Sequence, residues 1–339
     1  MELKEHFAGR IFSLISETAD ELGLECYVVG GYVRDIFLNR PSKDIDVVVV
    51  GSGIEMAQAF GKKLGRGAHV SVFKNFGTAQ VKFKDTEVEF VGARKESYSH
   101  DSRKPIVEDG TLEDDQNRRD FTINAMYYDP ATEEVYDYHH GFEDIAKRRL
   151  RMIGEPAERY REDPVRMLRA VRISAKLGFQ IEPATERPIS RMAKLLKNVP
   201  TARLVDEVLK LLTCGHAVEC VKRLREDGLS AALLPVLDHL LSSPEGEEFL
   251  MLALKRTDER LAIGKKISPF FLFGTLLWPQ VKRRWQYNEE TRGLSRIAAL
   301  HEAAVEVLET ECHTISIQRR FQADMHDLWL MQGRLERRT

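Results

Sequence analysis

The sequence predicts an α+β fold, in which a mixed sheet with helices occupies the first part of the chain and helices alone follow. Two observations support this prediction. Short apolar runs of strand length, separated by glycine turns and short helical patterns, extend to about Ala93. From Pro164 onward, apolar residues recur almost throughout at the spacing of amphipathic helices. A chain of 339 residues is long enough for two or three structural units.

The first part alternates helices with strands. Apolar residues at helical spacing predict an opening helix within residues 3–22, and Gly23 follows it as a stop. Buried strands are predicted at 26–29 and 44–50, with a glycine turn and a short helix at 32–39 between them. A helix at 56–65 and two further strands, at 69–83 and 87–93, complete this part.

The region after the sheet carries weaker signals. Residues 94–118 are highly charged and almost without apolar periodicity, which predicts a long loop of the kind that is usually functional or mobile. Residues 121–129 have strand or helix propensity, and residues 136–150 predict a turn that leads into a helix.

Composition excludes several classes of protein. A chain that is 43% hydrophobic with a net charge of -2 is neither disordered nor uniformly basic. Its apolar runs are shorter than the roughly 20 residues of a membrane span. Four cysteines without a CxxC pair argue against a zinc module or a disulfide framework. The N-terminus has no signal-peptide pattern, so we expect a cytoplasmic protein that begins at or near Met1.

The net charge conceals a local excess of cations. Between Lys147 and Lys176 the sequence has ten basic and four acidic residues, a local net charge of +6. This segment could bind an anionic partner, or it could form a solvated helix face with internal ion pairs.

Two carboxylates begin the second predicted strand. Asp44 and Asp46 flank Ile45, and residues i and i+2 of a strand point to the same face. Like charges this close repel unless a cation lies between them, and carboxylate oxygens suit Mg²⁺ that is bound together with substrate phosphates. Glu89, on a strand that could lie next to the pair, is a candidate third acid. By itself the D-x-D pattern is a weak signal, because it more often represents two solvated aspartates at a strand edge.

A glycine pair precedes these acids. Gly30 and Gly31 stand where the first strand turns into a helix, so backbone N–H groups there could approach a phosphate. Arg34, one turn into that helix, could offer its guanidinium to phosphate oxygens. Together with the acid pair, these residues describe a cradle for a triphosphate and a metal ion.

Three segments, in order and spacing, resemble the motifs of the class II family of nucleotidyltransferases, which contains the CCA-adding tRNA nucleotidyltransferases and the bacterial poly(A) polymerases. The segments are VVGGYVRDIFLNRPSKDIDVVV, NRRDFTINAMYYD and REDPVRMLRAVRISAKLGF. The resemblance covers roughly residues 24–235. It implies a catalytic nucleotidyltransferase head at 1–146, a helical neck that selects the nucleotide at 147–235, and a helical, RNA-binding body at 236–339.

The resemblance also implies roles for individual residues. Asp44 and Asp46 would ligate Mg²⁺, and Asp120 and Glu89 would complete the catalytic acids. Gly30, Gly31 and Arg34 would contact the incoming triphosphate. Arg119 and Asp120 would lie near the ribose, and Asn124 would support that turn or serve as a plain structural amide.

The neck motif has a local and a family interpretation. By local rules, Asp163 is an N-cap with Pro164 at the first helical position. In the family, Asp163 would accept a hydrogen bond from the amine of the base and Arg166 would donate to its ring nitrogen and carbonyl, which favours A and C over U and G. Glu162 could form an ion pair that holds Arg166. Arg169 and Arg172 resemble further nucleotide-contacting arginines.

The two branches of the family divide the chain. The head resembles the CCA-adding enzymes, whereas the neck and body resemble proteobacterial poly(A) polymerases, so the chain reads as a mosaic or a chimera. We expect template-independent addition of nucleotides from ATP to RNA 3′ ends, as in a poly(A) polymerase acting on mRNA. The alternative is CCA addition to tRNA with ATP and CTP. Poly(A) polymerases generally continue into a basic tail beyond the equivalent of Thr339, and a chain without it would bind RNA more weakly.

Two other classes fit part of the pattern. A catalytically silent RNA-binding homologue would explain the basic neck, but the metal-binding aspartates and the ribose and base motifs are intact in this sequence. A nucleotidyltransferase with a small-molecule acceptor would explain the acids, but the helical mass after residue 178 suits a polymeric acceptor better.

Overall fold

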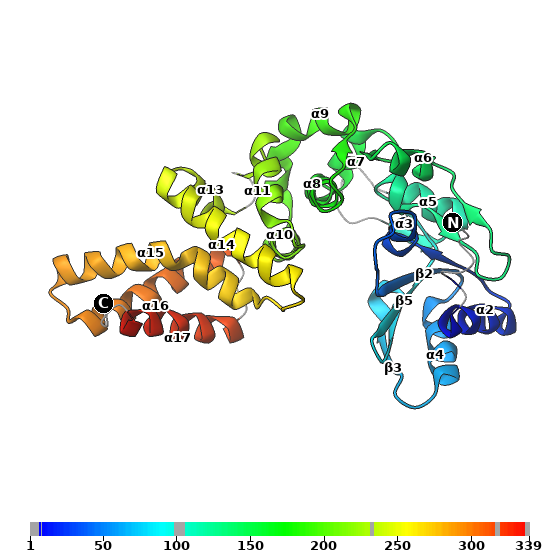
Figure 1. Cartoon of the computed structure of the whole chain (residues 1–339), viewed down its shortest axis with the longest axis horizontal. Coiled ribbons are helices and arrows are strands. Elements are labelled where there is room, and N and C mark those ends of the chain that lie inside the picture. The colour runs from blue at the N-terminus through cyan, green and yellow to red at the C-terminus, as the bar shows by residue number, and fades with distance from the viewer. Residues whose placement is uncertain (1–6, 8, 98–105, 231–233, 316–318, 336–339) are drawn as a thin grey trace. The chain divides into compact units, whose positions relative to one another are not determined.

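The computed structural model describes residues 7, 9–97, 106–230, 234–315 and 319–335. The chain divides into two compact units. The first comprises Met1–Glu162 and Gln180–Thr185, and the second comprises Asp163–Phe179 and Glu186–Thr339 (Figure 1). In the described part of the chain, no helix is both long enough and apolar enough to cross a membrane.

A seven-stranded mixed sheet forms the centre of the first unit, as the sequence predicts. Its strand order is β3-β4-β5-β2-β1-β8-β9. The strands are β1 (Glu25–Val29), β2 (Asp44–Val50), β3 (His69–Phe73), β4 (Thr78–Phe83), β5 (Thr86–Gly92), β8 (Tyr127–Tyr128) and β9 (Val135–Tyr136). Strands β2 and β5 run parallel, and the other neighbours in the sheet run antiparallel.

The segment 69–83, predicted as one strand, is a hairpin. Strands β3 and β4 pair antiparallel, and a short 3₁₀ helix, η1 (Lys74–Phe76), connects them. Gly77 closes this helix in the left-handed conformation, with φ of 65°. A glycine adopts that conformation without the steric cost that a side chain would add, which is why the chain reverses here.

Helices cover the sheet where the sequence predicts them. Helix α2 (Arg10–Leu22) packs against α4 (Gly53–Leu64), and α4 packs against strands β4 and β5 (Figure 1). Between β1 and β2 lies the short helix α3 (Gly31–Phe37). Lys63 of α4 forms ion pairs with Glu17 and Glu21 of α2.

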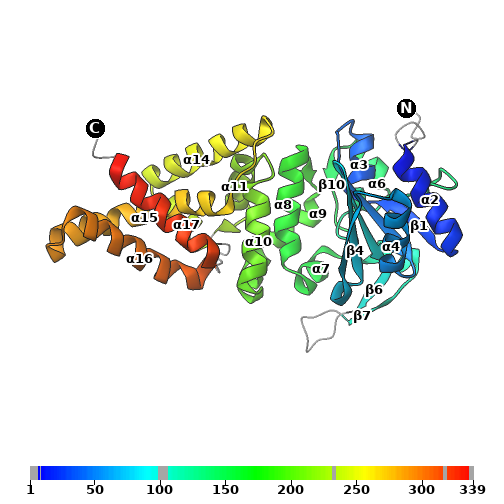
Figure 2. The same cartoon turned by 90° about the horizontal axis from the view of Figure 1, so that it is seen from below.

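The prediction of a loop over residues 94–118 is wrong for the part that the structure describes. Strands β6 (Arg94–Ser97) and β7 (Ile106–Asp109) pair antiparallel, and helix α5 (Leu112–Arg118) follows (Figure 2). Helix α5 begins with a capping box between Thr111 and Asp114. Backbone pairing stabilises the two strands and the capping box stabilises the helix start, so these charged elements form without apolar periodicity. Residues 98–105 lie outside the described residues.

The rest of the first unit leads from the sheet to its last helix. The elements are η2 (Thr122–Asn124), α6 (Gly141–Ala146), β10 (Arg149–Leu150) and α7 (Pro156–Glu162). Strand β10 pairs in parallel with β11 (Gln180–Ile181). The predicted turn into a helix after Tyr136 is therefore confirmed in α6.

Helices dominate the chain after Pro164, as predicted, with β11 as the exception among the described residues. They are α8 (Val165–Leu177), α9 (Pro183–Met192), η3 (Ala193–Asn198), α10 (Thr201–Leu212), α11 (Ala217–Glu226), α13 (Pro235–Leu241), α14 (Pro244–Ala262), α15 (Pro269–Arg292), α16 (Arg296–Ile315) and α17 (Arg319–Leu335).

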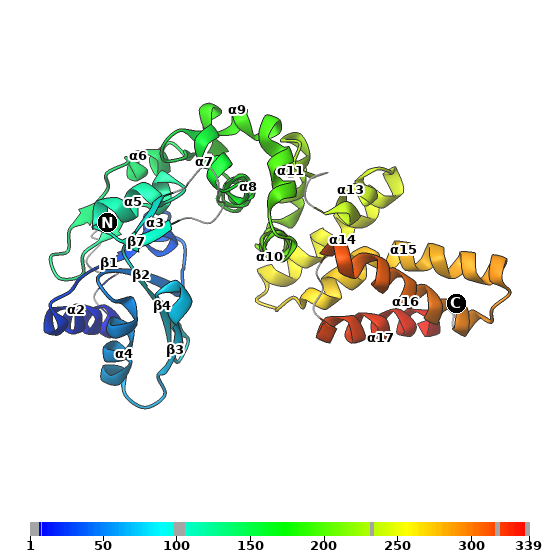
Figure 3. The same ribbon diagram turned by 180° about the vertical axis from the view of Figure 1, so that it is seen from behind.

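The last three helices pack against one another (Figure 3). Trp329 of α17 is buried against α15, where its indole N–H donates to the carbonyl oxygen of Gly274 at 2.9 Å. Trp285 of α15 donates in the same way to Arg296 at the start of α16. Each buried indole thus has its hydrogen-bond partner, so these large side chains can fill the core without an unsatisfied polar group.

Candidate active site

The strand β2 brings two carboxylates to one face of the sheet. Asp44 is exposed and Asp46 is half-buried, while Ile45 between them points to the opposite side and is buried. In the parallel ladder with β5, Asp46 lies directly opposite Glu89 and Asp44 lies opposite Glu87. The expected neighbourhood of Glu89 and the acid pair is therefore present in the structure.

These neighbouring acids disfavour the charged form of one another's carboxyl groups. Burial is the largest cause that raises the pKa of Asp46, to about 6, and the negative charges of Glu89 and Asp44 add to it, while Arg119 opposes them. The pKa of Glu89 is also raised, first by burial and then by Glu87 and Asp44. A bound cation would relieve this repulsion.

The acid pair fits Mg²⁺ in kind and in number of ligands. Mg²⁺ prefers oxygen ligands and, when bound with a nucleotide, is held by one or two protein carboxylates together with phosphate oxygens. Among the described residues there is no cluster of three or more His, Cys, Asp or Glu side chains arranged to hold a metal ion. A site built from Asp44, Asp46 and substrate oxygens needs no such cluster.

A glycine turn lies beside Asp46. Gly30 has a φ of 81°, and a Cβ at this position would lie 3.6 Å from Oδ2 of Asp46. A Cβ on Gly31 would lie 3.2 Å from Nη2 of Arg34. The glycines therefore leave the backbone at the start of α3 uncovered next to the acid, as expected for a chain that a phosphate approaches closely.

The side chain of Arg34 is buried and bonded inside the protein. Its Nε donates to Oδ1 of Asp35 at 3.0 Å, and its Nη1 donates to Oδ1 of Asn124 at 2.7 Å. Asn124 thus joins the RRDFTIN segment to helix α3, and its support of the turn near the ribose stays a prediction. Contact of Arg34 with a triphosphate remains a prediction.

Arg119 is fixed by a buried carboxylate that the sequence analysis missed. Its Nε donates to Oδ2 of Asp115 at 3.0 Å and to the hydroxyl of Tyr127 at 2.8 Å. Arg118 pairs with the other oxygen of Asp115 at 2.8 Å. Burial by itself would raise the pKa of Asp115, but Arg119 and Arg118 lower it below its ordinary value.

A signal for this cluster exists in the sequence. Asp115 precedes Arg118 by three positions and Arg119 by four, which is the spacing of ion pairs on a helix. The spacing is informative only where a helix is expected, and the segment was predicted as a loop.

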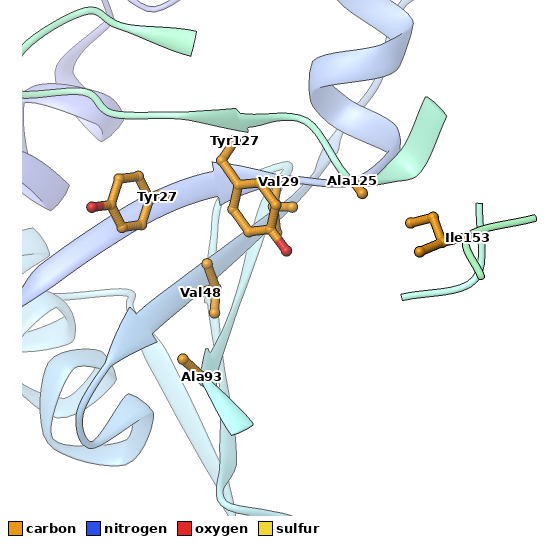
Figure 4. Close-up of a cluster of buried hydrophobic side chains, with 7 residues drawn as sticks. All are labelled: Tyr27, Val29, Val48, Ala93, Ala125, Tyr127 and Ile153. Atoms are coloured by element: carbon orange, nitrogen blue, oxygen red, sulfur yellow. The ribbon is translucent and has the colours of Figure 1, made fainter. Parts of the chain in front are cut away.

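A hydrophobic cluster supports the same segment (Figure 4). Its residues are Tyr27, Val29, Val48, Ala93, Ala125, Tyr127 and Ile153. Tyr127 presents its ring to this cluster and its hydroxyl to Asp115, to which it donates at 2.7 Å. Next to it, the backbone N–H of Ile153 donates to the carbonyl oxygen of Asp120 at 2.9 Å. This hydrogen bond fixes the backbone of Asp120, the residue after Arg119, beside the hydrophobic cluster.

Acids, arginines and aromatic side chains line one pocket of about 510 Å³ in the first unit. Its lining includes Asp46 and Glu89 on the sheet, Arg118 and Arg119 at the end of α5, and Phe73 and Phe76 of the β3–β4 hairpin. The pocket therefore combines a potential metal site with cationic and aromatic walls.

The neck motif lies at the start of the second unit. Helix α8 begins at Val165, and Pro164 occupies the N-cap position that the sequence predicts for Asp163. Asp163 lies one residue before this cap. Helix ends shift by a residue with small changes in geometry. The Asp163 carboxylate still serves the helix start, because Oδ1 accepts from the N–H of Val165 at 3.3 Å, while Oδ2 accepts from Arg203 at 2.7 Å.

The neck arginines differ in their surroundings. Arg166 is buried, and Nη2 of Arg169 lies 3.5 Å from Oε1 of the buried Glu207. Arg172 is half-buried. Glu162 ends the first unit, where its carboxylate accepts from Arg159 at 3.3 Å. An ion pair between Glu162 and Arg166 and the nucleotide contacts of these residues remain predictions.

Some cations of the basic segment are engaged in ion pairs. Lys147 pairs with Glu143 at 2.7 Å, and Arg149 pairs with the buried Asp144 at 2.8 Å. Nη2 of Arg159 donates to the carbonyl oxygens of Arg118 and Arg119, at 2.8 Å each. The interpretation as a face with internal ion pairs therefore applies to part of the segment, and binding of an anionic partner stays a prediction.

Comparisons with protein families match three regions of the chain. Residues 26–151 match the poly A polymerase head domain, and residues 178–241 match a probable RNA and SrmB-binding site of polymerase A. Residues 292–339 match the arginine-rich C-terminus of polymerase A.

Individual relatives match at different lengths. Poly(A) polymerase I of Haemophilus influenzae is 36% identical over 96% of this chain and 74% of its own length. A CCA-adding enzyme of Limosilactobacillus fermentum is 38% identical, over 63% of this chain and 50% of its own length. A solved tRNA nucleotidyltransferase, in complex with a primer tRNA and an incoming ATP analog, is similar with a TM-score of 0.62 and 25% identity. That similarity covers 96% of this chain and 100% of the other.

Proposed function

The chain belongs to the class II family of RNA 3′-terminal nucleotidyltransferases, and from this premise we propose that it is a poly(A) polymerase that adds adenylate from ATP to RNA 3′ ends without a template. The observation that supports adenylation is similarity to a poly(A) polymerase I over 96% of the chain, which includes the head that resembles the CCA-adding branch. The division into head (1–146), neck (147–235) and body (236–339) is part of this proposal, as is a cytoplasmic location.

Asp44 and Asp46 would hold Mg²⁺ in this enzyme, with Glu89 beside them. When bound, the metal ion supplies charge neutralisation at the phosphates and favours the attacking form of the acceptor 3′-hydroxyl. The raised pKa of Asp46 supports this assignment, since burial and two neighbouring acids disfavour its charge in the protein alone.

The other head residues would bind and orient the nucleotide. The backbone at Gly30 and Gly31 would approach the triphosphate, with Arg34 held behind it by Asp35 and Asn124. Arg119, fixed by Asp115 and Tyr127, would lie near the ribose with Asp120. A side chain that is held in place before the substrate arrives loses little entropy on binding it.

The neck residues would select the base. Asp163 would accept from the amine that A and C share, and Arg166 would donate to the ring nitrogen beside it. Arg203 holds one oxygen of Asp163 and the N–H of Val165 holds the other, which limits the positions that this carboxylate can adopt. Arg169 and Arg172 would contribute further nucleotide contacts.

One observation favours CCA addition as the second candidate. A CCA-adding enzyme is 38% identical to this chain, over 63% of the chain's residues. The two functions share the catalytic acids and differ in the acceptor and in the use of CTP.

One experiment separates these functions. The protein is incubated with an unstructured RNA, or with a tRNA that lacks its terminal CCA, and with ATP and CTP supplied singly and together. Long A-tails on both RNAs are the expected result. A three-nucleotide extension that is confined to the tRNA and needs CTP would overturn the proposal.

A variant pair tests the assigned chemistry. The double substitution of Asp44 and Asp46 by Ala should abolish incorporation and leave RNA binding intact. Asp85→Ala, which removes an exposed carboxylate from the turn between β4 and β5, is the control and should remain active. Incorporation by the double variant would refute the metal assignment.

A further inference from the structure

Two exposed phenylalanines lie in the pocket of the catalytic acids. Phe73 is 47% exposed and Phe76 is 71% exposed, and both line the pocket that contains Asp46 and Glu89. Among the described residues, no large hydrophobic side chain is more exposed than Phe76. An aromatic side chain in water next to a charged site indicates a binding surface rather than a core.

The hairpin backbone determines where these rings lie. Phe73 is the last residue of β3 and pairs with Thr78, the first residue of β4. Between them the N–H of Gly77 donates to the carbonyl oxygen of Lys74 at 3.2 Å and closes the turn. Phe76 therefore stands on a short connection that is anchored at both ends by the ladder.

The same pocket has a cationic wall. Arg94 and Arg118 line it together with Arg119. Burial lowers the pKa of Arg118, and the positive charges of Arg119 and Arg94 lower it further, although Asp115 and Glu96 partly compensate them. An anion near these guanidinium groups would reduce their repulsion.

These three features match the parts of one nucleotide at an RNA end. The acids are the place for its 3′-hydroxyl, an aromatic surface suits its base, and guanidinium groups suit its 5′-phosphate. Bases of any sequence stack on aromatic side chains, which is how proteins bind single strands without sequence preference. The incoming nucleotide is the other candidate, but its base is assigned to Asp163 and Arg166 in the proposed function.

We propose that Phe73 and Phe76 stack on the base of the 3′-terminal nucleotide of the RNA acceptor, while Arg94 and Arg118 face its phosphate. This inference rests on the proposed function, because it uses the acids as the place where the acceptor hydroxyl reacts. It makes Phe76 a positioning residue for the acceptor and assigns it no role in holding ATP.

The first test compares the kinetics of Phe76→Ala with those of the unaltered protein. The KM for a single-stranded RNA acceptor should rise about fivefold or more, and the KM for ATP should stay unchanged. Phe76→Trp, which restores an aromatic surface, should recover most of the loss. Phe142→Ala is the control, since Phe142 is 55% exposed in the same unit and does not line the pocket.

The second test removes the base instead of the ring. An acceptor whose 3′-terminal nucleotide is abasic should react with the unaltered protein as poorly as the normal acceptor reacts with Phe76→Ala. Combining the two changes should cause little further loss, because both remove the same contact. Equal losses from Phe76→Ala on both acceptors, or a raised KM for ATP alone, would overturn the inference.

Binding of the same two RNAs without ATP separates the inference from the proposed function. Phe76→Ala should weaken binding of the normal RNA about fivefold or more and leave binding of the abasic RNA unchanged. If the unaltered protein adds no nucleotide to any RNA and this binding difference remains, the proposed function fails, while the contact between Phe76 and the terminal base is retained. Addition without a binding difference would overturn the inference alone.

Discussion

Asp46 is held in surroundings that disfavour its charged form. Burial, Glu89 and Asp44 together raise its pKa to about 6, and Arg119 compensates them only in part. Groups that a site needs for binding a cation commonly reduce the stability of the empty protein.

The Asp46→Asn variant should therefore be more stable than the unaltered protein in EDTA. At pH 7 the gain should be about 1–3 kcal/mol, because the neutral amide removes the cost of the buried charge. The native pKa is raised, so the unaltered protein loses stability as the pH rises from about 4 to about 6. The gain should appear over this range and then stay constant. Amide hydrogen exchange in β1 and β2 measures it.

Asp85→Asn is the control for this prediction, since it removes an exposed carboxylate from the turn between β4 and β5 and should leave the exchange rates unchanged. If Asp46→Asn exchanges faster than the unaltered protein, Asp46 stabilises the empty site and the electrostatic argument fails.

Two cysteines of the second unit have thiols whose pKa values shift in opposite directions. The sulfur atoms of Cys214 and Cys220 lie 3.7 Å apart. A hydrogen bond from Cys220 is the largest cause that lowers the pKa of Cys214, to about 7, and the same interaction together with burial raises the pKa of Cys220. Burial raises the pKa of Cys26 in the first unit to about 12.

Iodoacetamide at pH 7.5 should consequently alkylate Cys214 before the other two cysteines whose side chains the structure describes, because the thiolate is the reactive form. Mass spectrometry of peptides after short exposure measures the order. Cys220→Ala removes this hydrogen-bond donor and should slow the labelling of Cys214. Faster labelling of Cys26 would contradict the assigned environment.

At the scale of elements, the cluster around α5 joins the buried Asp115 to the half-buried Arg118 and Arg119 and to the buried Tyr127. Asp115 is fully buried and neutralises Arg118 and Arg119, and Tyr127 donates to it from the hydrophobic cluster below. Removing one partner of a buried ion pair leaves the other charge uncompensated, and this usually costs more than the pair contributes.

Asp115→Ala should destabilise the first unit by about 3–5 kcal/mol and abolish nucleotide addition, since Arg119 loses the group that orients it. The midpoint of urea unfolding, followed by hydrogen exchange in the sheet, measures the first effect. Asp114→Ala is the control on the same helix. It removes only one half of an exposed capping box and should cost about 1 kcal/mol or less while activity persists.

The elements show what a single sequence can predict. The strand at 44–50 is predictable because five of its seven residues are apolar and no helical pattern competes. The two-residue period of a strand then places Asp44 and Asp46 on the same face. The pairing of Asp46 with Glu89 was anticipated, although only the sheet register establishes it.

Helix α5 was missed because its segment lacks apolar periodicity, the main signal from which the helices were predicted. The sequence Thr111-Leu-Glu-Asp114 carries a capping-box pattern, which predicts a helix start without any apolar periodicity. The contact between Arg34 and Asn124 joins residues that are 90 positions apart, and no local pattern reveals such a partner.

At the scale of the whole molecule, charge is distributed unevenly. The net charge is -2, yet residues 147–176 carry a local net charge of +6. Some of these cations pair with acids, as Lys147 does with Glu143, whereas Arg161 on α7 has an exposed side chain. Binding to RNA should therefore depend on this segment more than on the average charge of the protein.

RNA affinity should fall steeply with salt, because each neutralised phosphate of a single strand releases counterions and adds about -0.7 to the slope of log K against log salt. Arg161→Ala should reduce that slope by about 0.7 if Arg161 contacts a phosphate. Lys63→Ala is the matched control. Lys63 lies outside residues 147–176 and forms ion pairs with Glu17 and Glu21, so this substitution should leave the slope unchanged. Fluorescence anisotropy of a labelled RNA over a range of salt measures both slopes. Equal slopes for all three proteins would show that Arg161 contacts no phosphate.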